Sequence, residues 1–354
     1  MSLALHRAAS WVQNNLFRTW WQSLLTLVGL AMVWRIGRPI LDWAVFDAAF
    51  GTTPESCVGV RGACWSFIAD RYPVFLVGTY PGDERWRPFL AFVALLAVAV
   101  AALVRDVRRH RAFLWLALAV TVLMLALLRG GAALGLRPVP TEAWGGLMLT
   151  VILSAVGVAA SFPVGLLLAL ARRSRKMPAV RALAVGYIEL IRGVPLVSVL
   201  FLASVLVPLF LPGGAEVDSL VRAQIGIVAF QSAYIAEVIR GGLQAVPNGQ
   251  EEAATALGLS PLQVMRLVVV PQALRLVVPA MVNQLIIIVK DTSLVVVVGM
   301  HDLLGIAELT VRGAVWLGRT YEAYAFVGLI YWVICFSISR ASLRLETRFR
   351  QGRT

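Results

Sequence analysis

The chain has 354 residues, of which 59% are hydrophobic and only 14% are charged. Soluble domains carry about a quarter of charged residues, so this composition excludes an ordinary soluble protein and predicts a polytopic membrane protein. The formal net charge of +13 comes almost entirely from arginine, and basic cytoplasmic loops explain it without nucleic acid as a partner.

Eight apolar stretches approach the ~20 residues that a membrane-spanning helix needs. In chain order these candidate spans are residues 22–46, 88–104, 112–128, 146–170, 193–211, 223–241, 273–298 and 322–340. The first is the weakest, because Arg35 and Arg38 fall in its second half, and the alternative is a helix lying in the membrane interface. We expect an all-α helix bundle with about eight transmembrane helices.

The basic residues divide the loops into two sets. With both termini inside, the inner segments hold 19 basic and four acidic residues, and the outer segments hold nine basic and eleven acidic residues. Arginine runs at 105–111 and 172–176 and a basic tail at 346–354 contribute most to the inner set. Because cytoplasmic loops carry an excess of Lys and Arg, we expect both termini in the cytoplasm.

The loop at about 47–87 then faces outward and carries Cys57 and Cys64. In an oxidising compartment these two cysteines can form a disulfide, and two unpaired thiols are the alternative. We expect no metal site and no catalytic residues, because the three histidines are scattered and no Ser/His/Asp or Cys/His arrangement is present. The histidines are His6, His110 and His301.

The segment between the sixth and seventh spans is polar and reads as two short helices. Glu251 and Glu252 fall in the first turn of one helix, where carboxylates suit the positive helix end, and Gly258 is suited to end it. Such an elbow can dock into a groove of a partner, and packing against its own bundle is the alternative.

A second helix start comes directly after this glycine. Ser260 is predicted as its N-cap, Pro261 as its first residue and Gln263 as the partner that completes a capping box. Pro271 breaks or kinks this second helix, and the next span begins there.

The segment "EEAATALGLSPLQVMRLVVVPQAL" resembles the EAA loop of ABC importer permeases, with valine at two positions where the family usually has Ile and Leu. In that family the loop, here about 247–272, inserts into a cleft of the ATPase subunit. The resemblance therefore implies that ATPase coupling involves Glu251, Glu252, Ala253, Ala254, Gly258, Leu259 and Pro271.

Further stretches resemble the polar-amino-acid branch of these permeases, namely "YIELIRGVPL", "SAYIAEVIRGGLQAVPNGQ" and "KDTSLVVVVG". The resemblance implies a five-helix MetI-like permease core at 145–345. It follows a three-span extension at 1–144 that resembles the longer permease of general L-amino-acid transporters.

The resemblance implies a permease subunit of an ATP-driven importer of L-amino acids in the bacterial inner membrane. The implied partners are an ABC ATPase dimer, a second homologous permease or a second copy of this chain, a periplasmic amino-acid-binding protein and the bilayer. Neither Lys176 nor Lys290 follows a glycine, so no Walker A motif is present. We expect no cofactor in this chain, with ATP and Mg²⁺ used by the partner ATPase. A secondary transporter or channel, or a non-transporting anchor for an ATPase, are the alternatives.

Ionisable groups inside a bilayer usually pair or line a path. Glu189 and Arg192 are three residues apart on one helix face, and Glu237 and Arg240 repeat that spacing, so each set is expected to form an internal ion pair.

A zwitterionic amino acid needs donors and acceptors near the midplane. We hypothesise that Gln231, Ser232, Asn283 and Gln284 line its path, with helix–helix hydrogen bonding as the alternative. Lys290 and Asp291 are expected to form an outer gate or a structural pair, with a neighbour as the other possible partner of Asp291.

Overall fold

The computed structural model describes residues 2–103, 112–174, 176–210 and 217–351. Within these ranges the chain is helical apart from loops, isolated bridges and one two-residue strand, β1 (His301–Asp302). The arginine run at 105–111, which includes His110, lies outside the described residues, as do Arg175 and the last three residues of the expected basic tail.

The chain divides into two compact units. The first comprises residues 1–70 and 314–322, and the second comprises residues 71–313 and 323–354. The division falls within α3 (Ser66–Val77) and α15 (Thr320–Gln351). It does not coincide with the expected boundary at residue 144, because residues 71–144 pack with the second unit.

The first unit contains a long apolar helix and a tied loop. Its helices are α1 (Ser2–Leu16), α2 (Trp20–Leu41), the π-helix η1 (Asp42–Phe46) and the 3₁₀ helices η2 (Pro54–Cys57) and η9 (Ala314–Trp316). No residue of α2 is buried, as expected of a helix solvated by lipid. In the loop, Cys57 and Cys64 form a disulfide, and Glu322 accepts a hydrogen bond from the Cys64 backbone N–H at 3.0 Å.

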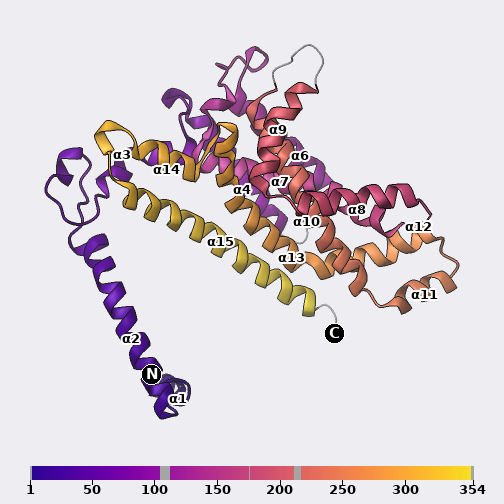
Figure 1. The fold of residues 1–354 in the computed structure, drawn as a ribbon, viewed down its shortest axis with the longest axis horizontal. Helices are drawn as coiled ribbons and strands as arrows, with labels where there is room; N and C mark the ends of the chain where they lie inside the picture. Colours follow the sequence, from indigo (N-terminus) through magenta and orange to yellow (C-terminus); the bar gives the residue numbers. More distant parts are fainter. Residues whose placement is uncertain (1, 104–111, 175, 211–216, 352–354) are drawn as a thin grey trace. The chain divides into compact units, whose positions relative to one another are not determined.

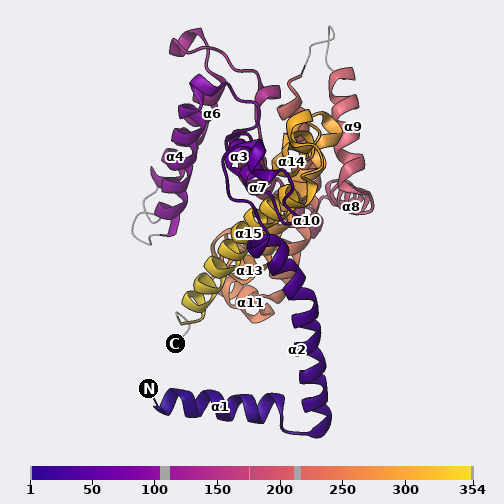
Figure 2. The same cartoon turned by 90° about the vertical axis from the view of Figure 1, so that its left-hand side faces the viewer.

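The second unit is built around three packed helices, α7 (Gly146–Arg173), α10 (Ser219–Ala245) and α13 (Val270–Asp291) (Figure 1). Their shared core includes Leu153, Ile227 and Ile288, all buried. The helices α4 (Trp86–Leu103) and α6 (Ala112–Arg129) lie side by side (Figure 2). The remaining helices of this unit are α8 (Pro178–Arg192), α9 (Leu196–Leu209), α11 (Asn248–Ala256), α12 (Pro261–Gln263), α14 (Leu303–Val311), the π-helix η7 (Val264–Val269) and the 3₁₀ helices η3 (Gly82–Glu84), η4 (Ala132–Leu134), η5 (Thr141–Ala143) and η8 (Thr292–Val298).

Each of the eight expected spans falls on a helix of the structure: α2, α4, α6, α7, α9, α10, α13 and α15. Among the described residues, four continuous stretches are long and apolar enough by themselves to cross a membrane: Trp20–Phe46, Gly146–Arg173, Pro261–Val298 and Thr320–Leu343. A fifth forms if α8 and α9, bent by 112°, count as one span. The bend follows Gly193 and precedes Leu196, where a kink is expected from Gly193 and Pro195.

A buried carboxylate joins four parts of the second unit. Asp302 is 1% exposed and caps α14 by accepting hydrogen bonds from the N–H groups of Leu304 and Gly305. Its other oxygen accepts hydrogen bonds from Tyr331 of α15 at 2.7 Å and from Thr292 of η8 at 3.2 Å. The cluster ties α14, α15 and η8 to one point, with Thr150 of α7 beside it.

Candidate functional site

The elbow, residues 248–269, connects α10 to α13 and begins with α11. Glu251 lies in the first turn of this helix. Gly258 follows its C-cap with a φ of +80°, in the left-handed region that an L-residue adopts only with strain. The predicted glycine stop is therefore confirmed by the backbone.

The second half of the elbow begins with the predicted capping box. The Ser260 hydroxyl accepts from the Gln263 N–H, and the Gln263 side chain accepts from the Ser260 N–H at 2.8 Å. The helix then widens into η7 and continues as α13, with Pro271 in the first turn of α13. A missing N–H is tolerated at that position.

The elbow has two faces with opposite character. On the inner face, Ala254 and Val264 are buried in a core cluster, and Leu259 packs against it. On the outer face, Leu257 is 82% exposed and Leu262 is 77% exposed. The packing alternative therefore holds for the inner face, whereas docking of a partner on the exposed outer face stays a prediction.

The two adjacent glutamates also point to different surroundings. Arg173, at the end of α7, donates to Glu251 at 2.5 Å, and the two side chains are 40% and 45% exposed. Glu252 is exposed and forms no ion pair with another described residue. Glu251 therefore links the elbow to α7, whereas Glu252 remains available on the surface.

A cluster of ion pairs joins the C-terminal parts of α7, α8 and α10. Glu237 pairs with Arg240 at 2.9 Å, as predicted, and also with Arg172 at 2.6 Å and Arg192 at 3.5 Å. Glu189 pairs with Arg172 at 3.2 Å. Glu189 and Arg192 therefore do not pair with each other, which corrects the expectation. Each of them reaches a partner on a neighbouring helix that the spacing along α8 does not reveal.

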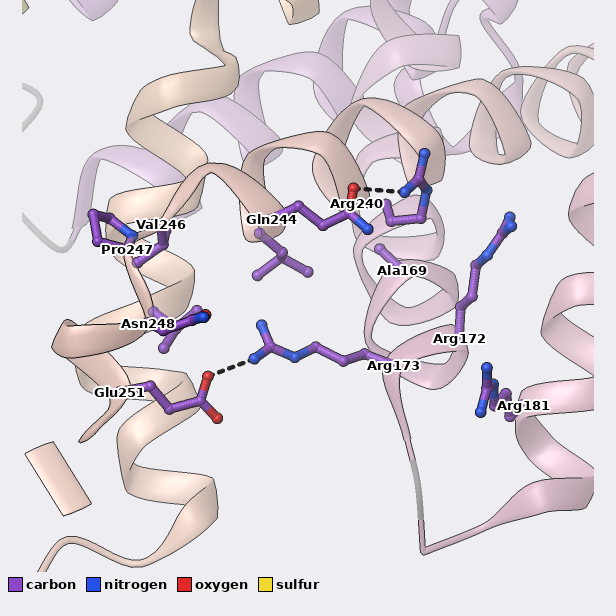
Figure 3. A pocket seen from close by; sticks show the side chains of 12 residues that line it. Ala169, Arg172, Arg173, Arg181, Arg240, Gln244, Val246, Pro247, Asn248 and Glu251 are labelled. Atoms are coloured by element: carbon purple, nitrogen blue, oxygen red, sulfur yellow. Dashed lines mark hydrogen bonds and ion pairs between the residues drawn. The ribbon is translucent and has the colours of Figure 1, made fainter.

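A basic cavity of about 450 Å³ lies behind the elbow (Figure 3). We call it the arginine recess. Its lining residues are Ala169, Arg172, Arg173, Arg181, Arg240, Leu243, Gln244, Val246, Pro247, Asn248, Glu251 and Val269. The sequence carried no signal for this recess, because its arginines come from three helices and the run at 172–176 was interpreted only as an orientation signal.

The polar residues expected on the solute path are separated in the structure. Gln231 and Ser232 are buried: Gln231 donates to Asp291 at 3.3 Å, and Ser232 lies 3.0 Å from the Tyr187 hydroxyl. Asn283 is exposed and Gln284 is partly buried. The four side chains therefore differ in burial and partners, and their role in transport stays a prediction.

The expected pair of Lys290 and Asp291 does not form either. Lys290 is exposed, and no ion pair joins it to Asp291 in the described part of the chain. Asp291 instead takes the Gln231 amide on α10 as its partner. The alternative of a neighbouring partner for Asp291 thus corresponds to the structure.

Comparison with known proteins shows similarity to a family of transport proteins. Residues 161–351 match the model of the binding-protein-dependent transport system inner membrane component. The chain is 47% identical over 350 residues to the inner membrane amino-acid ABC transporter permease protein YhdY of Escherichia coli K12, covering 98% of this chain and 95% of that protein. It is 35% identical over 410 residues to the glutamate/glutamine/aspartate/asparagine transport system permease protein BztC of Rhodobacter capsulatus, covering 97% of this chain and 94% of that protein.

A solved structure shares the fold of the second half of the chain. It is described as the crystal structure of an amino acid ABC transporter with histidines, and the likeness has a TM-score of 0.52 at 33% sequence identity. The match covers 57% of this chain and 92% of the other.

Proposed function

The chain belongs to the family of binding-protein-dependent transport system inner membrane components. We propose that it is the permease subunit of an importer that takes up L-amino acids and is driven by a separate ATPase. Its helices and its family make it a multi-pass inner membrane protein and an ABC importer permease. The names of the relatives, all amino-acid permeases, support the substrate class. The outer face of the elbow is the observation that carries the coupling mechanism.

The coupling mechanism starts at that face. Leu257 and Leu262 offer exposed apolar surface on the elbow, and Glu252 adds an exposed carboxylate on its first helix, a combination suited to a groove with a basic rim on the ATPase. Ala254 and Leu259 anchor the opposite face in the bundle. A displacement of the elbow is therefore passed to α10 and α13, as rocking between inward and outward access requires.

The ion cluster makes the inner ends of three helices move together. Glu237 forms ion pairs with arginines of α7, α8 and α10, and Arg173 connects α7 to the elbow. Removing one member leaves the other charges without compensation. We infer that ATP binding and hydrolysis, with Mg²⁺, occur in the ATPase and that this cluster spreads the resulting motion.

A second permease, either a homologue or another copy of this chain, is proposed to cover α13. Asn283 and Lys290 are seven residues apart and both exposed, so they lie on one face of this spanning helix. Such groups are unfavourable against lipid, and a subunit on this face would line a path with them and Gln284. The remaining partners in this proposal are an ATPase dimer and a periplasmic amino-acid-binding protein.

Reconstitution into liposomes tests the proposal. The chain, its partner permease, the ATPase and the binding protein should together give ATP-dependent uptake of L-amino acids. Glu252→Lys should abolish uptake, whereas Glu142→Lys, which changes an exposed glutamate of η5, should leave it intact. Uptake without ATP or partners would indicate a secondary transporter. ATPase binding without any uptake would indicate an anchor.

A further inference from the structure

The arginine recess carries more positive charge than the protein neutralises. The recess and the adjoining ion cluster hold five arginines and three glutamates, which leaves a formal charge of +2. These residues are Arg172, Arg173, Arg181, Arg192, Arg240, Glu189, Glu237 and Glu251. Arg181 forms no ion pair with any described residue, and it lines the same cavity as Arg172, Arg173, Arg240 and Glu251.

The residues that line the recess favour a small anion as its ligand over a protein partner. Leu257 and Leu262, the exposed leucines of the elbow, are not among the residues that line it. Glu252 does not line the recess either; it lines an adjoining, more open pocket that shares Asn248 and Glu251 with the recess and also includes Thr255. An ATPase seated on the outer face of the elbow therefore leaves the recess behind it free for a ligand.

The residual charge selects the chemistry of that ligand. A phosphate monoester carries about −1.5 to −2 charges and three strong acceptor oxygens, which matches +2, whereas a single carboxylate would leave one positive charge uncompensated. Guanidinium groups bind phosphate oxygens through paired N–H donors, and the Gln244 and Asn248 side chains add neutral donors at the wall. We propose that the arginine recess binds a phosphomonoester anion, for which inorganic pyrophosphate serves as a more highly charged soluble analogue.

Occupancy of the recess acts on the elbow through Arg173. In the structure, Arg173 is paired with Glu251, the only carboxylate among the residues that line the recess. Both side chains are partly exposed, and such pairs contribute little stability. An anion in the recess therefore competes with Glu251 for Arg173 and releases the link between α7 and α11. This consequence rests on the proposed coupling role of the elbow, whereas the binding itself does not.

Two sources can supply this chemistry, a soluble phosphate compound and a phosphatidic acid headgroup of the bilayer. For the first, the whole transporter in phosphatidylcholine nanodiscs is titrated with inorganic pyrophosphate by calorimetry. For the second, nanodiscs that also contain phosphatidic acid are used, and the lipid retained after extraction is counted by native mass spectrometry. Saturation in the first assay alone assigns a soluble ligand, and Arg181-dependent retention in the second alone assigns the lipid.

Three variants make the test specific. Arg181→Gln should weaken binding by about fivefold or more, since a charge-assisted hydrogen bond is lost, and Glu251→Gln should strengthen it, since the competing carboxylate is gone. Arg266→Gln, an exposed arginine of η7 outside the recess, should bind as the unmodified chain does. Phosphate sites of the ATPase contribute equally to all forms.

The inference is overturned if Arg181→Gln and Arg266→Gln bind pyrophosphate and retain phosphatidic acid equally. It would survive a failure of the proposed function, because a complex that does not transport amino acids can still show this order of affinities. Conversely, if the complex transports amino acids but its affinity for pyrophosphate and phosphatidic acid does not depend on Arg181, only the proposed ligand of the recess is refuted.

Discussion

Asp302 connects four elements, so its removal should destabilise the packing of all four. Asp302→Ala deletes the N-cap of α14 and leaves the Tyr331 hydroxyl without its buried acceptor, whereas the Thr292 hydroxyl keeps the Val289 carbonyl. A lost cap costs about 1 kcal/mol and each unsatisfied buried group about 1–3 kcal/mol, so we expect a loss of about 3 kcal/mol. Thermal unfolding in detergent measures it.

The matched control is Asp302→Asn, whose amide oxygen can keep the cap while its NH₂ group can donate to the Tyr331 hydroxyl, so it should be milder. Equal melting temperatures for the alanine variant and the unmodified chain would contradict the role of the cluster.

Tyr80 makes stability depend on pH at the alkaline end. Its hydroxyl donates to the Leu128 carbonyl at 2.7 Å, and burial raises the pKa of Tyr80 above its ordinary value of 10.0, with Arg87 acting in the opposite direction. Because the folded pKa is the higher one, the contribution is complete below pH 10 and is lost as the pH rises through the raised pKa.

Tyr80→Phe should therefore lower the free energy of unfolding by about 1 kcal/mol at pH 9, the worth of one hydrogen bond, and by less at pH 11. Denaturant titrations at both pH values measure the difference. Tyr72→Phe, at an exposed tyrosine, is the control and should show no such change. A difference for Tyr80→Phe that stays constant with pH would refute the assignment.

At the scale of elements, substitutions on the two faces of the elbow should affect ATPase docking and folding stability separately. Leu257→Ser changes a side chain that is 82% exposed, so stability should change by less than about 0.5 kcal/mol. If this leucine is an anchor for the ATPase, the affinity should fall about tenfold or more. Biolayer interferometry with the chain in nanodiscs measures the affinity.

Leu259→Ser, two residues away, is the matched control because Leu259 packs on the inner cluster. It should lower the melting temperature while leaving the outer face unchanged. Identical behaviour of the two variants would show that the elbow does not have two functionally distinct faces.

At the scale of the whole molecule, the charge distribution predicts which side each loop faces. In a Cys335→Ser background, Glu142→Cys should react with an impermeant maleimide in spheroplasts, whereas Leu257→Cys should react only after permeabilisation. The background alone should remain unlabelled, since Cys57 and Cys64 form a disulfide. Labelling at 257 in intact spheroplasts would reverse the proposed orientation.

The features that could be predicted from the sequence are those that depend on neighbouring residues. The capping box of Ser260 and Gln263, the left-handed Gly258 and the break before Leu196 rest on contacts within a few residues, so their local signals were sufficient. The helices at the eight expected spans could be placed for a similar reason, because burial in lipid demands about 20 apolar residues in a row whatever the neighbouring helices are.

Tertiary structure alone decided the partners of the polar groups. Spacing predicts Arg192 as the partner of Glu189 and leaves Asp291 with Lys290 or a neighbour, whereas the observed partners, Arg172 and Gln231, lie on other helices. The arginine recess could not be predicted from the sequence for the same reason, since its charges are brought together only by the packing of α7, α8 and α10. Amino-acid order determines which segments are helices and which faces are apolar, whereas the energy of pairing buried charges depends on distances that only the folded chain establishes.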